Sequence, residues 1–110
     1  MTDPADLPAV DLLAAFAARR LSPVEALDAV LARIERAEPS LCALYALDPD
    51  GARAAARESE ARWLRGEARG LEGVPATIKE NIATKGVPVP LGTAARDLVL
   101  GLLLDAEEAA

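Results

Sequence analysis

Apolar residues recur at helical spacing in two neighbouring stretches near the start of the chain. One stripe, within Ala9–Arg20, predicts a first helix that the Leu21-Ser22-Pro23 step interrupts. A second stripe predicts another helix, which ends before Pro39. Because each stripe must be covered, we expect the two helices to pack on a partner or on each other. The stripe residues are Leu12, Leu13, Phe16 and Ala17 in the first helix and Val24, Leu27, Val30, Leu31 and Ile34 in the second.

Helix boundary signals accompany these stretches. Ser22 lies where an N-cap is expected, Pro23 takes the first helical position, and Glu25 follows three residues after the serine. Together they predict a capping box at the start of the second helix. A third helix is predicted over Ala52–Arg65, with Gly66 as its carboxyl-terminal stop.

Two apolar segments are too short for good helices and are predicted as strands. Leu41–Leu47 precedes an Asp-Pro-Asp-Gly turn and is expected to be a buried or edge strand. Ala76–Ile78 has the character of a short buried strand. Gly86–Pro90 is expected to be an extended loop, because its prolines remove backbone donors. The sequence therefore predicts an α/β fold, with amino-terminal helices packed on the beginning of a mixed β-sheet.

Composition and charge narrow the classes of protein that fit. With 110 residues the chain is expected to form at most one domain, and 52% hydrophobic residues exclude a disordered chain. A net charge of −6 would repel the phosphate backbone of nucleic acids and anionic lipid surfaces. No apolar run approaches ~20 residues, and the amino terminus lacks the basic-then-apolar order of a signal peptide. We therefore expect no nucleic-acid partner and no membrane.

Metal and thiol chemistry have few candidate residues. The sequence holds one cysteine, Cys42, and no histidine, so neither an internal disulfide nor a zinc cluster is expected. Without a histidine to activate it, Cys42 is interpreted as a small core residue and not as a nucleophile. We expect no metal, no cofactor and a reducing, cytoplasmic location.

The segment Gly73–Asn81, with the sequence GVPATIKEN, sets one lysine at the end of an apolar, β-branched run. Burial of Lys79 beside Val74, Ile78 and Ile82 would remove hydration from the ammonium form and favour the neutral amine. A neutral amine accepts a proton near neutral pH, so Lys79 is the candidate catalytic residue. Without any family context, the same side chain also fits a partly exposed lysine whose stem covers apolar surface.

Together with Gly86 and the Leu91-Gly92-Thr93 step, GVPATIKEN resembles the lysine-bearing segment of the amidase signature family, serine hydrolases that cleave carboxamides. The Leu21-Ser22-Pro23 step and the Arg33-Ile34-Glu35 triplet are similar to the early helices of that family. The resemblance implies a serine, serine, lysine triad in which Lys79 takes a proton, through a bridging serine, from a nucleophilic serine.

In the family, both serines lie in a glycine- and serine-rich stretch downstream of the lysine. The serines of this sequence are Ser22, Ser40 and Ser59. Ser22 is interpreted as a helix cap, Ser59 lies within a predicted helix, and Ser40 follows a proline in a predicted turn. None has the setting of a nucleophile, so the chain is expected to be inactive alone.

The resemblance covers roughly residues 7–97. We interpret residues 1–97 as the amino-terminal part of an amidase signature domain, and residues 98–110 as a divergent tail that arose by truncation or frameshift. In the complete enzyme, a small-molecule carboxamide would be converted to a carboxylate plus ammonia or an amine. Two alternatives stay open. One is a fragment of a glutamyl-tRNA amidotransferase A-type subunit, while the other is a non-catalytic helical module that binds a partner or itself through its first two helices.

The predicted sheet has a further consequence for the isolated chain. A strand whose neighbours are missing exposes backbone donors and apolar faces. We therefore expect marginal stability and self-association through exposed apolar surface.

Overall fold

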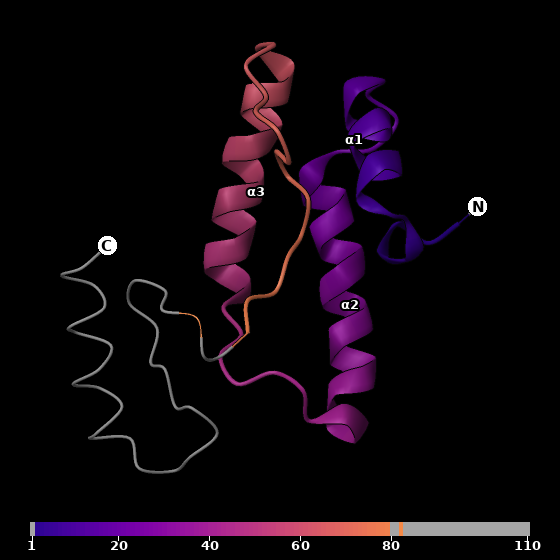
Figure 1. Cartoon of the computed structure of the whole chain (residues 1–110), viewed down its shortest axis with the longest axis vertical. Coiled ribbons are helices and arrows are strands. Elements are labelled where there is room, and N and C mark those ends of the chain that lie inside the picture. Colours follow the sequence, from indigo (N-terminus) through magenta and orange to yellow (C-terminus); the bar gives the residue numbers. More distant parts are fainter. Residues whose placement is uncertain (1, 80–81, 83–110) are drawn as a thin grey trace, which may run out of the picture. The chain divides into compact units, whose positions relative to one another are not determined.

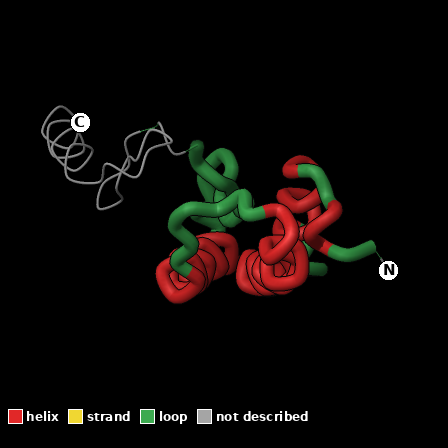
Figure 2. The backbone as a smooth tube through the Cα atoms, turned by 90° about the horizontal axis from the view of Figure 1, so that it is seen from below, coloured by secondary structure: helices red, strands yellow, loops and turns green. Residues whose placement is uncertain are grey.

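The computed structural model describes residues 2–79 and 82 of the chain. The chain divides into two units, Met1–Ala76 and Thr77–Ala110, and the described helices all belong to the first unit. A short 3-10 helix, η1 (Pro4–Asp6), is followed by α1 (Ala9–Ala17), α2 (Pro23–Leu41) and α3 (Pro49–Leu64). Figure 1 shows α2 and α3 running side by side in opposite directions, and the view in Figure 2 agrees. After α3, the chain turns back along these two helices.

Phe16 lies at the centre of a small core that all three helices contribute to. Its side chain is 2% exposed and clusters with Leu12 from α1 and Ala26 from α2. The indole of Trp63, on α3, approaches the Phe16 ring at a centroid distance of 6.0 Å in a tilted arrangement. Partly buried apolar residues surround this cluster: Leu7, Leu13, Leu21, Trp63 and Val74. The predicted packing of the first two helices is thus confirmed, with α3 as a further partner.

Two of the predicted helix boundaries are confirmed. The Ser22 hydroxyl accepts a hydrogen bond from the Glu25 amide at 3.1 Å, and the Glu25 carboxylate accepts one from the Ser22 amide at 3.0 Å, which completes the capping box. At the end of α3, Gly66 adopts a φ of +73°. The amide of Glu67 then donates to the carbonyl of Arg62 at 2.8 Å, as in a Schellman cap.

Other boundaries differ from the prediction. α1 ends at Ala17 and not at Arg20, because Arg19 adopts a left-handed φ of 57° and closes the helix in the same way as Gly66. α2 continues through Pro39 to Leu41, since a proline in the last turn costs only one backbone hydrogen bond. α3 begins at Pro49 because the preceding Asp48 caps it, by accepting a hydrogen bond from the Gly51 amide at 3.0 Å.

The predicted α/β fold is wrong for the part of the chain that the structure describes. Residues 2–79 and 82 form helices and loops, with no strand. In Leu41–Leu47, the first residue belongs to α2, and the amide of Leu44 donates to the Glu38 carboxylate at 2.8 Å. Ala76–Ile78 is also loop, and Ile78 is 60% exposed. A strand needs a neighbour to pair with its backbone, and apolar composition alone does not supply one. The predictions for 86–90 and 98–110 lie outside the described residues.

Ion pairs connect η1 to α2 and α2 to α3. The Arg33 guanidinium on α2 donates to Asp3 at 2.7 Å and to Asp6 at 2.8 Å, which holds η1 against the helix. Arg53 on α3 donates to Asp28 on α2 at 3.4 Å.

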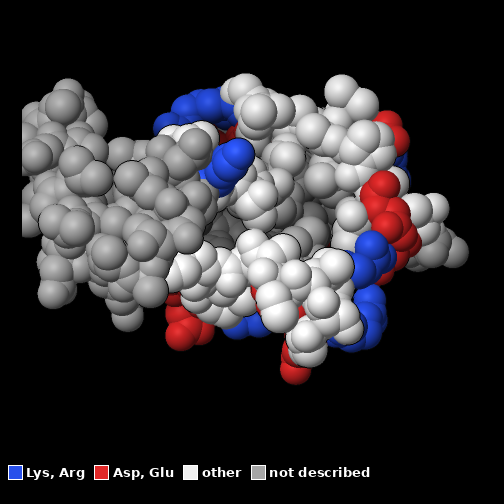
Figure 3. Space-filling model, turned by 60° about the horizontal axis from the view of Figure 1, so that its bottom comes forward, with Lys and Arg blue, Asp and Glu red and all other residues white. Residues whose placement is uncertain are grey.

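On the face shown in Figure 3, acidic and basic side chains both lie around the margin, while the middle is mainly uncharged. Among the described helices, none combines the length and apolarity needed to cross a bilayer.

Candidate functional site

Gly73, the first residue of the lysine-bearing motif, packs directly on the start of α2. Its φ is +83°, and a Cβ atom built there would lie 2.6 Å from Cγ and 2.8 Å from Cβ of Pro23. The ring of Pro23 is fully buried. Only glycine fits both the backbone angle and the contact. The Gly-Val-Pro and Leu-Ser-Pro steps, far apart in sequence, therefore meet in the structure.

Glu72 lies immediately before this glycine and is buried, with its side chain only 5% exposed. Its carboxylate accepts hydrogen bonds from the Ser59 hydroxyl at 2.8 Å, from Nε and a terminal nitrogen of Arg62, and from Nε of Arg69 at 3.3 Å. The backbone carbonyl of Glu72 accepts a further bond from the Trp63 indole at 3.0 Å. We call Glu72 with Ser59, Arg62, Trp63 and Arg69 the Glu72 cluster. It fixes the loop after α3 onto the last turns of that helix.

The Glu72 cluster keeps its carboxylate ionised. The hydrogen bond from Arg62 lowers the pKa of Glu72 to about 2, and the bonds from Ser59 and Arg69 act in the same direction, while burial opposes them. The same contact raises the pKa of Arg62. Neither residue was a site candidate in the sequence, because the contact depends on how the loop folds back. The Arg69 to Glu72 spacing of three residues was the only local signal.

Acid should therefore weaken the fold through Glu72. Its pKa is lower in the folded chain than in the unfolded one, so the unfolded chain takes up the proton first. The stabilisation is fully present above about pH 5 and is lost as pH falls toward about 2, by about 3 kcal/mol at most. Urea unfolding of the wild type and of Glu72→Gln at several pH values measures this. The difference between the two should shrink with falling pH; a constant difference contradicts the assignment.

Lys79 lies in the second unit, and its side chain is exposed. Ile78 and Ile82, which the sequence predicted to bury it, are 60% and 56% exposed. The Lys79 carbonyl accepts a hydrogen bond from the Ile82 amide at 3.0 Å. Val74, at the other end of the motif, packs on the core around Phe16. The described residues thus anchor the start of the motif but do not supply the apolar cover predicted for Lys79.

The three serines are placed as helix residues or caps. Ser22 caps α2, as predicted. Ser59 is buried in α3 and donates to Glu72. Ser40 is exposed in the last turn of α2, where the sequence had predicted a turn.

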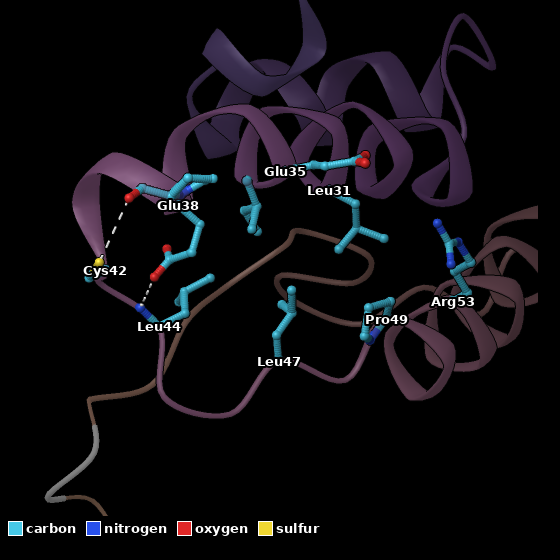
Figure 4. A pocket seen from close by; sticks show the side chains of 10 residues that line it. Leu31, Glu35, Glu38, Cys42, Leu44, Leu47, Pro49 and Arg53 are labelled. Carbon is cyan, nitrogen blue, oxygen red and sulfur yellow. Dashed lines mark hydrogen bonds between the residues drawn. The ribbon is translucent and has the colours of Figure 1, made fainter.

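An apolar groove of about 720 Å³ opens between the second half of α2, the loop 42–48 and the start of α3 (Figure 4). In the view shown, Glu35 extends from α2 along one side of the groove and Arg53 lies at the end formed by α3. Cys42 lines the groove and is exposed, so its interpretation as a core residue is wrong. It has a left-handed φ of 48° because it caps α2. The residues lining the groove are Leu31, Ile34, Glu35, Glu38, Pro39, Cys42, Leu44, Leu47, Pro49 and Arg53.

The described residues hold no group of three or more acidic, histidine or cysteine side chains arranged to bind a metal ion. Arg62 and Arg69 are already bound to Glu72, so the Glu72 cluster is a closed structural network.

Comparison with known proteins identifies the family. The amidase family model matches residues 25–98. The glutamyl-tRNA(Gln) amidotransferase A subunit of Anaeromyxobacter sp. strain K is 46% identical over 81 residues, which is 73% of this chain and 16% of that protein. The corresponding A subunits of Chloroflexus aurantiacus (44%) and Rhizobium meliloti (38%) match 73% and 79% of this chain and 17% and 18% of their own lengths.

The chain thus spans about one sixth of the length of these relatives. No solved structure gives a significant match. The family model covers α2 from Glu25 onward, α3 and the whole GVPATIKEN segment, and the resemblance seen in the sequence rested mainly on the last of these. The chain belongs to the amidase family.

Proposed function

We propose that this chain contributes the proton-accepting lysine, Lys79, to an enzyme that cleaves carboxamides. The observation that carries the proposal is the GVPATIKEN segment in a chain of the amidase family. The close contact of Gly73 with Pro23 supports it, because it gives a physical reason why this segment begins with a glycine.

In the proposed reaction, the neutral amine of Lys79 accepts a proton from a bridging serine, which takes one from the nucleophilic serine. The nucleophile forms a bond to the amide carbonyl carbon, and the bond from carbon to nitrogen then breaks. The relay returns the proton to the leaving nitrogen, and water releases the acyl group as a carboxylate. Both serines must come from residues other than Ser22, Ser40 and Ser59, since Ser22 caps α2, Ser59 is bound to Glu72 and Ser40 lies exposed in the last turn of α2.

The proposal sets a condition on the surroundings of Lys79. A lysine works as a base only when its ammonium form is destabilised, which apolar cover or a nearby cation achieves. Because the described residues leave Lys79 exposed, the cover must come from residues other than these. The 110-residue chain alone is expected to release no ammonia, because none of its three serines has the setting of a nucleophile.

Glutamine is the first substrate to test. The matched relatives carry the name of an amidotransferase, and such an enzyme moves an amide nitrogen from a donor. We also propose a cytoplasmic location, because a single cysteine is typical of proteins of a reducing compartment. Simple aliphatic and aromatic amides form the second group of substrates.

A chimera tests the proposal directly. The segment of the Anaeromyxobacter A subunit that matches this chain is replaced with the matching residues of this chain, and ammonia release from glutamine is measured. We expect the chimera to retain activity, since 46% of the exchanged positions are identical. A chimera that unfolds cooperatively on heating but releases no ammonia from any amide in the panel would overturn the proposal.

A non-catalytic interaction module is the second candidate, favoured by the apolar groove. The α1 stripe is used in the core through Leu12 and Phe16, and Leu27 of the α2 stripe is buried, whereas Leu31 and Ile34 of the α2 stripe line the groove. Leu41, Tyr45 and Leu47 near the groove are 67%, 50% and 49% exposed. We expect concentration-dependent self-association in size-exclusion chromatography with light scattering, weakened by Leu47→Glu. A monomer at all concentrations would remove this candidate.

A further inference from the structure

We propose that Glu72 is a positioning residue for Lys79: its cluster clamps the chain just before Gly73, so that the lysine-bearing segment leaves the helices from one fixed point. The inference rests on the proposed function for its catalytic part, but the clamp itself is a property of this chain. It assigns a role to a residue outside the serine and lysine relay.

The geometry of the clamp is specific to this loop. Glu72 uses both carboxylate oxygens and its backbone carbonyl, and its partners on α3 lie close together near the end of that helix, at Ser59, Arg62 and Trp63. Arg69 closes the cluster from the loop itself. Two backbone hydrogen bonds lie within the loop, from the Glu72 amide to the Arg69 carbonyl and from the Val74 amide to the Leu71 carbonyl. Such a loop has little local structure to hold it without the carboxylate.

The clamp limits how far Lys79 can move. Ala76 is the last residue of the helical unit, and Lys79 follows three residues later. Three extended residues span at most about 11 Å. If the loop detaches at Glu72, only the contacts of Gly73 with Pro23 and of Val74 with the core still hold it to the helices, and the lysine gains freedom as these contacts loosen. Misplacement of a catalytic group by about 1 Å can cost on the order of 100-fold in rate.

The fluorescence emission of Trp63 reports whether this clamp is formed. Trp63 is the single tryptophan of the sequence, and its indole donates to the Glu72 carbonyl. We expect Glu72→Gln to shift its emission to the red and to speed amide exchange over residues 71–79 by about 10-fold, with α2 unchanged. Glu72→Ala should have a larger effect in the same direction. Glu67→Gln is the matched control, because Glu67 lies in the same loop but pairs with Arg65 at the surface.

Kinetics of the chimera then separate positioning from stability. At a temperature where each variant is fully folded, Glu72→Gln should lower kcat for ammonia release about 10-fold or more and leave KM nearly unchanged. Glu67→Gln should leave both unchanged. Ser59→Ala, which removes one of the bonds to the carboxylate, should give a smaller loss than Glu72→Gln and serves as the second variant if Glu72→Ala fails to fold.

The outcomes are distinct. Unchanged emission and exchange in Glu72→Gln would overturn the clamp, whatever the activity. A released clamp with unchanged kcat would overturn the positioning role. A chimera that is inactive with Glu72 intact counts against the proposed function, while the emission and exchange measurements on the 110-residue chain still decide whether Glu72 holds the loop.

Discussion

Replacing Lys79 with alanine in the active chimera is expected to lower kcat for amide hydrolysis by about 10²- to 10⁴-fold. That range is the contribution of a positioned acid or base to such a reaction. Lys79→Arg should not restore activity, because a guanidinium stays charged and does not accept the proton. The measurement is ammonia release from glutamine under saturating substrate, with the wild-type chimera as reference.

Lys85→Ala is the matched control, since Lys79 and Lys85 are the two lysines of the sequence. It should leave kcat within about 2-fold, as expected for a lysine outside the reaction. The Lys79 variant should also keep its thermal stability, because an exposed side chain contributes little to folding. Small primary amines added to Lys79→Ala should restore part of the rate by replacing the missing base. Retention of more than about a tenth of the rate by Lys79→Ala would contradict a relay that needs this amine.

Local signals in the sequence predict the starts of the first two helices. Ser22, Pro23 and Glu25 form a capping box because the required atoms lie within one turn, and this geometry depends on nothing else in the chain. Asp48-Pro49 is the same kind of start signal, yet the sequence pattern favours a turn there and a third helix that begins three residues late. The helix that begins at Pro23 carries a strongly apolar stripe, whereas the helix that begins at Pro49 carries a weak one made mostly of alanine.

The sequence patterns did not predict contacts between segments that lie far apart in the chain. The predicted strand at Leu41–Leu47 failed because α2 tolerates Pro39 and because Glu38 binds the amide of Leu44. Nothing in the local pattern reveals that choice. Likewise, Glu72 looks like one more surface acid in a charged loop. Its burial follows from the way the loop returns along α3, which brings it to residues ten and thirteen positions earlier.

For Lys79, the sequence identified the residue but not its surroundings. The family resemblance pointed to Lys79, and the chain belongs to that family, but the expected burial of the lysine is not found in the described residues. The reasoning from apolar neighbours assumed that Ile78 and Ile82 turn toward the lysine, whereas both are more than half exposed. The structure shows instead that the segment is anchored at Gly73 and Glu72, and this is where substitution should have its greatest effect on folding.

Gly73→Ala is expected to destabilise the helical unit by about 3 kcal/mol, the sum of about 1–2 for the left-handed backbone and about 1–3 for the overlap with Pro23. Other glycines separate these two contributions. Gly66 has a φ of +73° but nothing within 4 Å of the position that a methyl group would take, and Gly70 has open space and no positive φ. Gly66→Ala should therefore cost about 1 kcal/mol and Gly70→Ala close to none. Urea unfolding, followed by Trp63 emission and circular dichroism, measures all three.

A double-mutant cycle with Pro23→Ala isolates the contact itself. Removing the Pro23 ring eliminates the atoms that a Gly73 methyl group would meet, so the second substitution should cost less in that background. The backbone contribution stays, because φ at residue 73 remains +83°. We expect a coupling free energy of about 1–2 kcal/mol. Strict additivity would mean that Gly73 is required for its backbone angle alone, and that the meeting of the two motifs at Pro23 does not restrict the lysine-bearing segment.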